Sequence, residues 1–187
     1  MTPAVGFEAL PRRLFLDSCT VQIIGQYGEF IWENQPIAES DPIQNDDEAL
    51  DILHALRRIL RVNERALFEW FLSDASVAEA AAKNDPTHLR WVLDVLDHTR
   101  VCLEESGGAT TASAALAERL DEPRFGYLSA ADRKLIGDAV RLRCDAFLTL
   151  DRRLARNAAP LHRELGMHVL SPKDYWAMLE PWAGLYA

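Results

Sequence analysis

The chain has 187 residues, of which 20 are basic and 29 acidic, so its formal net charge is −9. Hydrophobic residues make up 49% of the sequence, which excludes a disordered chain and suffices for the core of one α/β domain. The acidic balance argues against non-specific binding of nucleic acid through a basic surface, although metal ions can supply positive charge locally. Because no apolar run approaches about 18 residues, we expect no transmembrane helix.

The cysteines and the N-terminus both favour a cytoplasmic protein. Cys19, Cys102 and Cys144 are far apart and form no CxxC pair, which argues against a zinc site or a disulfide framework. The first residues lack a charged segment followed by a long apolar one, so we expect no signal peptide.

The first half of the chain begins with a short apolar strand and a helix. Residues 33–51 then contain seven acidic residues, two prolines and no basic residue, which predicts a polar loop before the next helix. We interpret residues 33–65 as a helical and acidic insertion within a single domain that spans residues 1–187. The elements expected here are strand 12–16, helix 20–31, a helix from about 46, strand 65–72, helix 73–85 and helix 86–105.

The second half continues with helices and strands in alternation. Strands that alternate with helices predict an α/β fold, with a parallel sheet covered by helices on both faces. The elements expected here are loop 105–111, helix 112–120, helix 128–144, strand 145–150, helix 152–158, strand 166–171 and helix 172–182.

Four acidic residues stand where strands end or helices begin. Asp17 and Asp151 directly follow predicted strands, and Glu79 and Asp132 lie in the first turns of predicted helices. Because ligands of parallel α/β sheets bind at the carboxyl ends of the strands, we expect these carboxylates to converge there. Four unpaired carboxylates would repel one another, and a divalent cation resolves this repulsion. Oxygen ligands suit Mg²⁺ or Mn²⁺, which activate water and stabilise charge on a scissile phosphate.

Each of these acids, taken alone, also has an explanation as a helix cap. Asp17 and Asp151 are in positions typical of N-caps. Glu79 and Asp132 each stand three residues after a serine, Ser76 and Ser129, which is the spacing of a capping box. Asp132, however, shares its helical face with apolar residues and is expected to point along the buried side of its helix.

The sequence resembles PIN-domain nucleases. The stretches "LFLDSCT", "SVAE", "LSAADRKLIGDAV" and "DAFLTLDRRL" follow the pattern of that family in order and spacing, and the resemblance covers about residues 12–176. It implies a PIN-like, flavodoxin-like parallel sheet and metal-dependent cleavage of single-stranded RNA. Many small members of the family are toxins of toxin–antitoxin pairs, so the resemblance also implies a small antitoxin protein as a partner, and a homo-oligomer. The apolar helices expected over residues 50–60 and 89–103 also favour a homo-oligomer.

The resemblance assigns a role to each of several residues. It implies that Mg²⁺ or Mn²⁺ is held by the catalytic residues Asp17, Glu79, Asp132 and Asp151. Ser18 and Thr149 would support them with hydroxyl groups. We expect the substrate to contact the arginines that follow the last acid, namely Arg152, Arg153 and Arg156.

Two departures from the family and two alternative functions remain open. The family often has Asn directly after the first Asp, where this chain has Ser18, and the stretch from about 28 to 65 is longer than in the compact toxins. One alternative is a non-catalytic domain of the same fold that binds a partner or RNA. The other is a phosphatase of the haloacid dehalogenase type, which requires a second Asp where this chain has Cys19.

Overall fold

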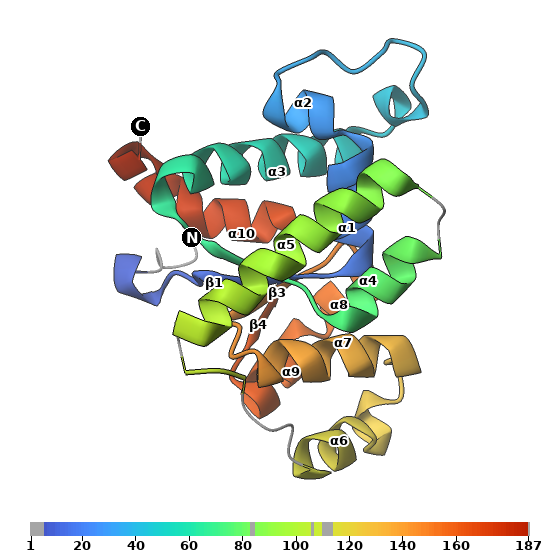
Figure 1. The fold of residues 1–187 in the computed structure, drawn as a ribbon, viewed down its shortest axis with the longest axis vertical. Helices are drawn as coiled ribbons and strands as arrows, with labels where there is room; N and C mark the ends of the chain where they lie inside the picture. The colour runs from blue at the N-terminus through green and yellow to red at the C-terminus, as the bar shows by residue number, and fades with distance from the viewer. Residues whose placement is uncertain (1–5, 83–84, 106, 110–113, 187) are drawn as a thin grey trace.

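The computed structural model describes residues 6–82, 85–105, 107–109 and 114–186. Its centre is a four-stranded sheet in the order β2-β1-β3-β4, in which all neighbouring strands are parallel (Figure 1). The predicted α/β class with a helix-covered parallel sheet is therefore confirmed. The strands are β1 (Arg13–Leu16), β2 (Glu69–Phe71), β3 (Ala146–Leu148) and β4 (His168–Leu170).

Helices connect the strands and cover the sheet. The α-helices are α1 (Ser18–Gln26), α2 (Gly28–Trp32), α3 (Asp47–Ala66), α4 (Asp74–Ala81), α5 (Pro86–Glu105), α6 (Ala114–Leu120), α7 (Ala130–Arg141), α8 (Arg152–Arg156), α9 (Ala158–Leu165) and α10 (Pro172–Leu179). The 3-10 helices are η1 (Phe7–Ala9), η2 (Pro42–Asn45), η3 (Pro123–Phe125) and η4 (Glu180–Tyr186).

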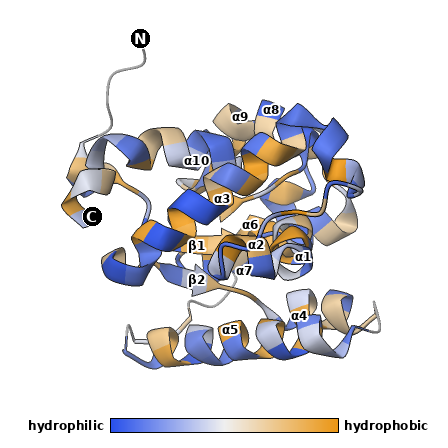
Figure 2. Cartoon of the chain, turned by 90° about the horizontal axis from the view of Figure 1, so that it is seen from above, coloured by the Kyte–Doolittle hydropathy of each residue, from blue (hydrophilic) through white to orange (hydrophobic). Residues whose placement is uncertain are grey.

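Alternation along the strands sorts the core into two clusters, one on each face of the sheet. Leu14 and Leu16 point to the face covered by α1, α2, α3 and α10, whereas Phe15 points to the face covered by α6, α7 and α9. The Phe15 ring stacks on that of Phe147 in the neighbouring strand, with ring centroids 5.4 Å apart. In Figure 2, α3 and α5 carry both apolar and hydrophilic residues, as expected for helices buried on one side only.

Helix α3 is an integral part of the core. Leu53, Leu56 and Ile59 of this helix are completely buried, and α3 packs against α10. The strand predicted at 65–72 is wrong in its first part, because α3 extends to Ala66. Leu67 then takes a left-handed conformation with φ of 52° and ends the helix.

The chain contains a helix, α9, that we did not predict. This helix contains Pro160, a residue type that interrupts a helix at interior positions. The proline is harmless because it occupies the first turn of α9, where backbone N–H groups have no intrahelical partner.

Several sequence-based predictions concern residues outside the described part. The loop predicted at 105–111 and the start of the helix predicted at 112–120 include residues 106 and 110–113, and the end of the helix predicted at 73–85 includes residues 83–84. Within the described residues, no helix is both long enough and apolar enough to cross a membrane.

The two helices expected to support oligomerisation use much of their apolar surface within the chain. Leu53 and Leu56 of α3 and Val92 and Leu96 of α5 are buried in the monomer. The homo-oligomer implied by the resemblance therefore gains no support from these apolar residues.

Candidate active site

The carboxyl ends of β1 and β3 bring two of the predicted acids to one edge of the sheet. Asp17 directly follows β1, and its backbone N–H donates to the carbonyl of Leu148 at the end of β3, at 3.0 Å. Asp151 follows β3 by three residues and begins α8. Since β1 and β3 are parallel neighbours, their ends meet at this edge.

The carboxylate of Asp17 is buried and held by neutral donors. Thr149 donates its hydroxyl to Asp17 Oδ2 at 2.6 Å, and the Cys19 thiol donates to the same oxygen at 2.8 Å. The backbone N–H of Ser18 donates to Oδ1 at 2.8 Å. Asp17 is only 8% exposed and forms no ion pair within the described residues. Its negative charge is thus surrounded by dipoles alone.

Thr149 connects Asp17 to Asp151. Its Oγ1 donates to Asp17 and accepts from the backbone N–H of Asp151 at 3.0 Å. Thr149 is completely buried, so these two contacts fix the distance between the acid that follows β1 and the acid that follows β3. The supporting role that the resemblance implies for the Thr149 hydroxyl is consistent with these two hydrogen bonds.

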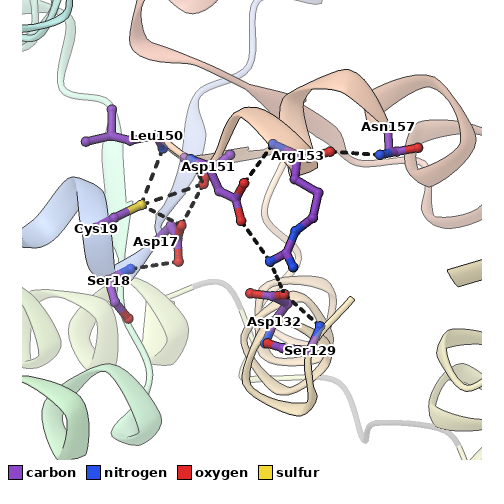
Figure 3. Close-up of polar contacts among 10 residues, drawn as sticks. Asp17, Ser18, Cys19, Ser129, Asp132, Leu150, Asp151, Arg153 and Asn157 are labelled. Carbon is purple, nitrogen blue, oxygen red and sulfur yellow. Dashed lines mark hydrogen bonds and ion pairs between the residues drawn. The ribbon is translucent and has the colours of Figure 1, made fainter. Parts of the chain in front are cut away.

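Arg153 lies between Asp151 and Asp132. Its Nη2 contacts Asp151 Oδ2 at 2.9 Å and Asp132 Oδ2 at 3.2 Å. Figure 3 shows the resulting chain of contacts, which leads from Asp17 to Asp151 and through the guanidinium to Asp132. Three acids far apart in sequence therefore gather at one edge, and a positive side chain joins two of them.

The same acids also cap helices, as each was expected to do when taken alone. Ser129 donates its backbone N–H to Asp132 Oδ2 at 2.8 Å, and the N–H of Asp132 donates back to Ser129 Oγ at 3.1 Å. Asp151 accepts from the N–H of Arg153 at 2.7 Å and thereby caps α8. Capping orients both carboxylates, and it leaves each of them in contact with Arg153 as well.

Glu79 is not part of this contact chain. The capping box predicted for Ser76 and Glu79 is wrong, because α4 begins earlier, with Ser73 as its N-cap and Ser76 as its third residue. Glu79 is half-buried on α4, a helix that packs against both α1 and α7. Among the described residues, no three acidic, His or Cys side chains are close enough together to hold a metal ion.

Two of the three arginines that were expected to contact substrate form ion pairs within the chain. Arg152 forms an ion pair with Glu48 of α3, and Arg153 forms those with Asp132 and Asp151. The acidic stretch 33–51 also reaches this region, because its residue Glu48 contacts Arg152. Arg156 is exposed and forms no ion pair within the described residues.

Two side chains that follow Asp17 complete this region, namely Ser18, which the resemblance assigned as a supporting hydroxyl, and Cys19. The hydroxyl of Ser18 is buried and has no hydrogen-bond partner among the described residues. Burial and the neighbouring Asp17 carboxylate raise the pKa of Cys19 to about 12, so its thiol stays protonated at neutral pH. The sequence placed Cys19 next to the acid but gave no sign that its thiol would donate to the carboxylate.

Asp145 lies at the other end of the strands. Its Oδ2 accepts hydrogen bonds from two backbone N–H groups, both at 2.9 Å. One belongs to Arg12, which precedes β1, and the other to Arg13, the first residue of β1. Asp145 thus joins the start of β1 to the start of β3 and has a structural role.

Replacing Thr149 with Val is expected to lower the free energy of unfolding by about 1–3 kcal/mol, the cost of leaving buried polar groups without partners. Asp17 Oδ2 would lose its shortest contact and the N–H of Asp151 would lose its acceptor. Thr149→Ser keeps the hydroxyl and should stay much closer to the wild type. Urea denaturation measures both, and a Val variant as stable as the wild type would contradict the linking role of this hydroxyl.

Comparisons with protein-family models, with curated proteins and with solved structures found no match to this chain.

Proposed function

We propose that the chain is a Mg²⁺- or Mn²⁺-dependent endoribonuclease that cleaves single-stranded RNA in the cytoplasm. The observation that supports it best is the contact chain from Asp17 through Thr149, Asp151 and Arg153 to Asp132. These residues come from three separate parts of the sequence. Helix capping alone does not require them to meet at one edge of the sheet.

The donor set fits a divalent cation in its chemistry. The side chains at this edge offer carboxylate and hydroxyl oxygens, which Mg²⁺ and Mn²⁺ prefer. Asp17 is buried without a cationic partner, and Ser18 Oγ is buried without a hydrogen-bond partner within the described residues. The guanidinium of Arg153 already supplies positive charge between Asp132 and Asp151. It stands in for the cation that would bind these two carboxylates, and it would move aside when the cation binds.

Each residue would have its own role in the proposed cleavage of RNA. Asp17, Asp132 and Asp151 would hold the cation, and Glu79 would join them from α4, directly or through water. When bound, the cation would lower the pKa of a coordinated water and stabilise negative charge on the phosphate. Thr149 would keep Asp17 and Asp151 at a fixed separation, and Arg156 is free to bind the phosphate backbone of RNA.

The alternatives differ in what they predict for the same residues. A phosphatase of the haloacid dehalogenase type needs a second carboxylate at position 19, where the neutral Cys19 thiol cannot serve as an acid or base at neutral pH. A non-catalytic domain is the stronger alternative, because Arg153 neutralises two of the acids without any metal.

The test of this proposal is cleavage of an end-labelled, single-stranded RNA pool of mixed sequence. We expect shortening of the RNA with Mn²⁺ or Mg²⁺, none with EDTA, and none by an Asp151→Asn variant purified in parallel. Release of inorganic phosphate from p-nitrophenyl phosphate without RNA cleavage would favour the phosphatase. Absence of both activities would favour the non-catalytic domain.

A further inference from the structure

A groove lies at the far end of α1 from the candidate active site. Two adjoining hollows of about 170 and 540 Å³ share Gly25, Gly28, Trp32 and Thr87 in their linings. Residues at the start of α5 form one wall, and residues of the segment that follows α2 form the other. Figure 1 shows where these two elements lie in the fold. Because the hollows adjoin, the groove is suited to an elongated occupant.

The smaller hollow, beside the start of α5, is the more apolar part of the groove and is lined by Ile24, Gly25, Gly28, Trp32, Thr87, His88 and Trp91. Gly25 lets α5 approach closely, since a Cβ at this position would lie only 2.3 Å from Nδ1 of His88. The ring of Trp91 lies 6.3 Å from that of His88 and lines the same hollow. Trp32 is 46% exposed, a large value for such an apolar side chain, and it borders both hollows.

The segment that forms the outer wall is held in place. Asp41 Oδ1 accepts from the Tyr27 hydroxyl at 3.1 Å and from the backbone N–H of Ile43 at 2.9 Å. Ile43 is buried in the core, and Arg61 of α3 donates to Asn34 Oδ1 at 3.3 Å. The groove therefore has two anchored walls rather than one.

The charge of the groove selects the kind of occupant. Glu29, Glu33 and Asp41 line it, and no Lys or Arg is among the described lining residues. Glu29 and Glu33 are exposed and form no ion pair within the described part of the chain. An acidic rim repels the phosphates of a nucleic acid and attracts a cationic ligand.

We propose that this groove binds an extended, positively charged segment of a partner protein. An aliphatic or aromatic side chain of the segment packs against Trp32, and its lysines or arginines pair with Glu29 and Glu33. This proposal is independent of the proposed nuclease function, because no acid of the candidate active site lines the groove.

The test begins with random ten-residue peptides displayed on phage and selected on the full-length protein. We expect selected peptides to carry net positive charge together with Leu, Ile, Phe or Trp. Fluorescence anisotropy then measures the Kd of synthetic versions. Trp32→Ala and the double variant Glu29→Lys/Glu33→Lys should each weaken binding at least about tenfold, and added salt should weaken it further.

Matched controls lie outside the groove. Leu93 on α5 is 42% exposed, close to the exposure of Trp32, and Glu104 and Glu118 are exposed acids. Leu93→Ala and Glu104→Lys/Glu118→Lys should change the Kd by no more than about twofold. The proposal is overturned if selection yields no binders, if selected peptides are neutral or acidic, or if groove and control variants weaken binding equally. Binding of single-stranded poly(U) that is lost in Trp32→Ala would overturn it in favour of base stacking.

Discussion

Asp132→Asn is expected to reduce metal-dependent RNA cleavage by more than about a hundredfold, beyond the effect typical of residues that only support a metal ligand. The substitution removes a carboxylate oxygen that contacts Arg153 and that, in the proposed site, would bind the cation. Asn keeps one side-chain oxygen, so the variant should retain the fold. Cleavage of the labelled RNA pool under single-turnover conditions measures the effect.

Asp174 provides a matched control for this variant. It is the third residue of α10 and forms the same capping box with Ser171 that Asp132 forms with Ser129. Asp174→Asn should cost similar stability, at most about 1 kcal/mol, and leave cleavage unchanged. If both variants cleave RNA like the wild type, Asp132 is a cap and has no part in catalysis.

Leu56→Ala is expected to lower the free energy of unfolding by about 2–5 kcal/mol, the usual cost of emptying a well-packed core position. Leu56 is completely buried on the inner face of α3, within the stretch 33–65 that the sequence suggested was an insertion. The expected loss of stability is large because α3 packs against α10. Helix α3 therefore cannot move to fill the cavity left by the smaller side chain without displacing α10.

Leu67 supplies the control for this second variant. It directly follows α3 but is 80% exposed, so Leu67→Ala should change the free energy of unfolding by no more than about 0.5 kcal/mol. Urea denaturation measures the free energy of unfolding of both variants. The dependence of this free energy on urea concentration should be the same as in the wild type. Equal stabilities of Leu56→Ala and the wild type would mean that α3 is dispensable to the fold.

The part of the site that follows strands could be predicted from the sequence. Asp17 and Asp151 come directly after apolar stretches, and the carboxyl ends of parallel strands necessarily share an edge. The buried hydroxyl of Thr149 belongs to the same stretch as Asp151, but its supporting role was implied only by the resemblance to PIN-domain nucleases. Alternation within β1 and β3 also decided which residues face each core cluster.

Other features depend on tertiary contacts that no local pattern reveals. The start of α4 moved from Ser76 to Ser73, because both serines satisfy the same capping preference. The position of Arg153 between two acids depends on how α7 and α8 approach each other. We interpreted residues 33–65 as an insertion, because the packing partner that makes α3 part of the core, α10, lies more than a hundred residues later in the chain.

Arg153 gives the metal hypothesis a specific consequence. Its guanidinium contacts both Asp132 and Asp151, and its side chain is half exposed, so the ion pairs contribute only about 0.5–1 kcal/mol to stability. Arg153→Gln should therefore fold normally and bind Mn²⁺ more tightly, since the competing positive charge is gone.

The most direct test of a cation site at this sheet edge is thermal melting in chelator-treated buffer with Mn²⁺ added back. At a concentration about a hundred times the Kd, Mn²⁺ should stabilise the wild type by about 2.7 kcal/mol and raise its Tm by roughly 5–10 °C. The shift should be much smaller in Asp17→Asn and Asp151→Asn and at least as large in Arg153→Gln. Equal Mn²⁺ shifts in the wild type and both Asn variants, or no shift in any protein, would contradict the account.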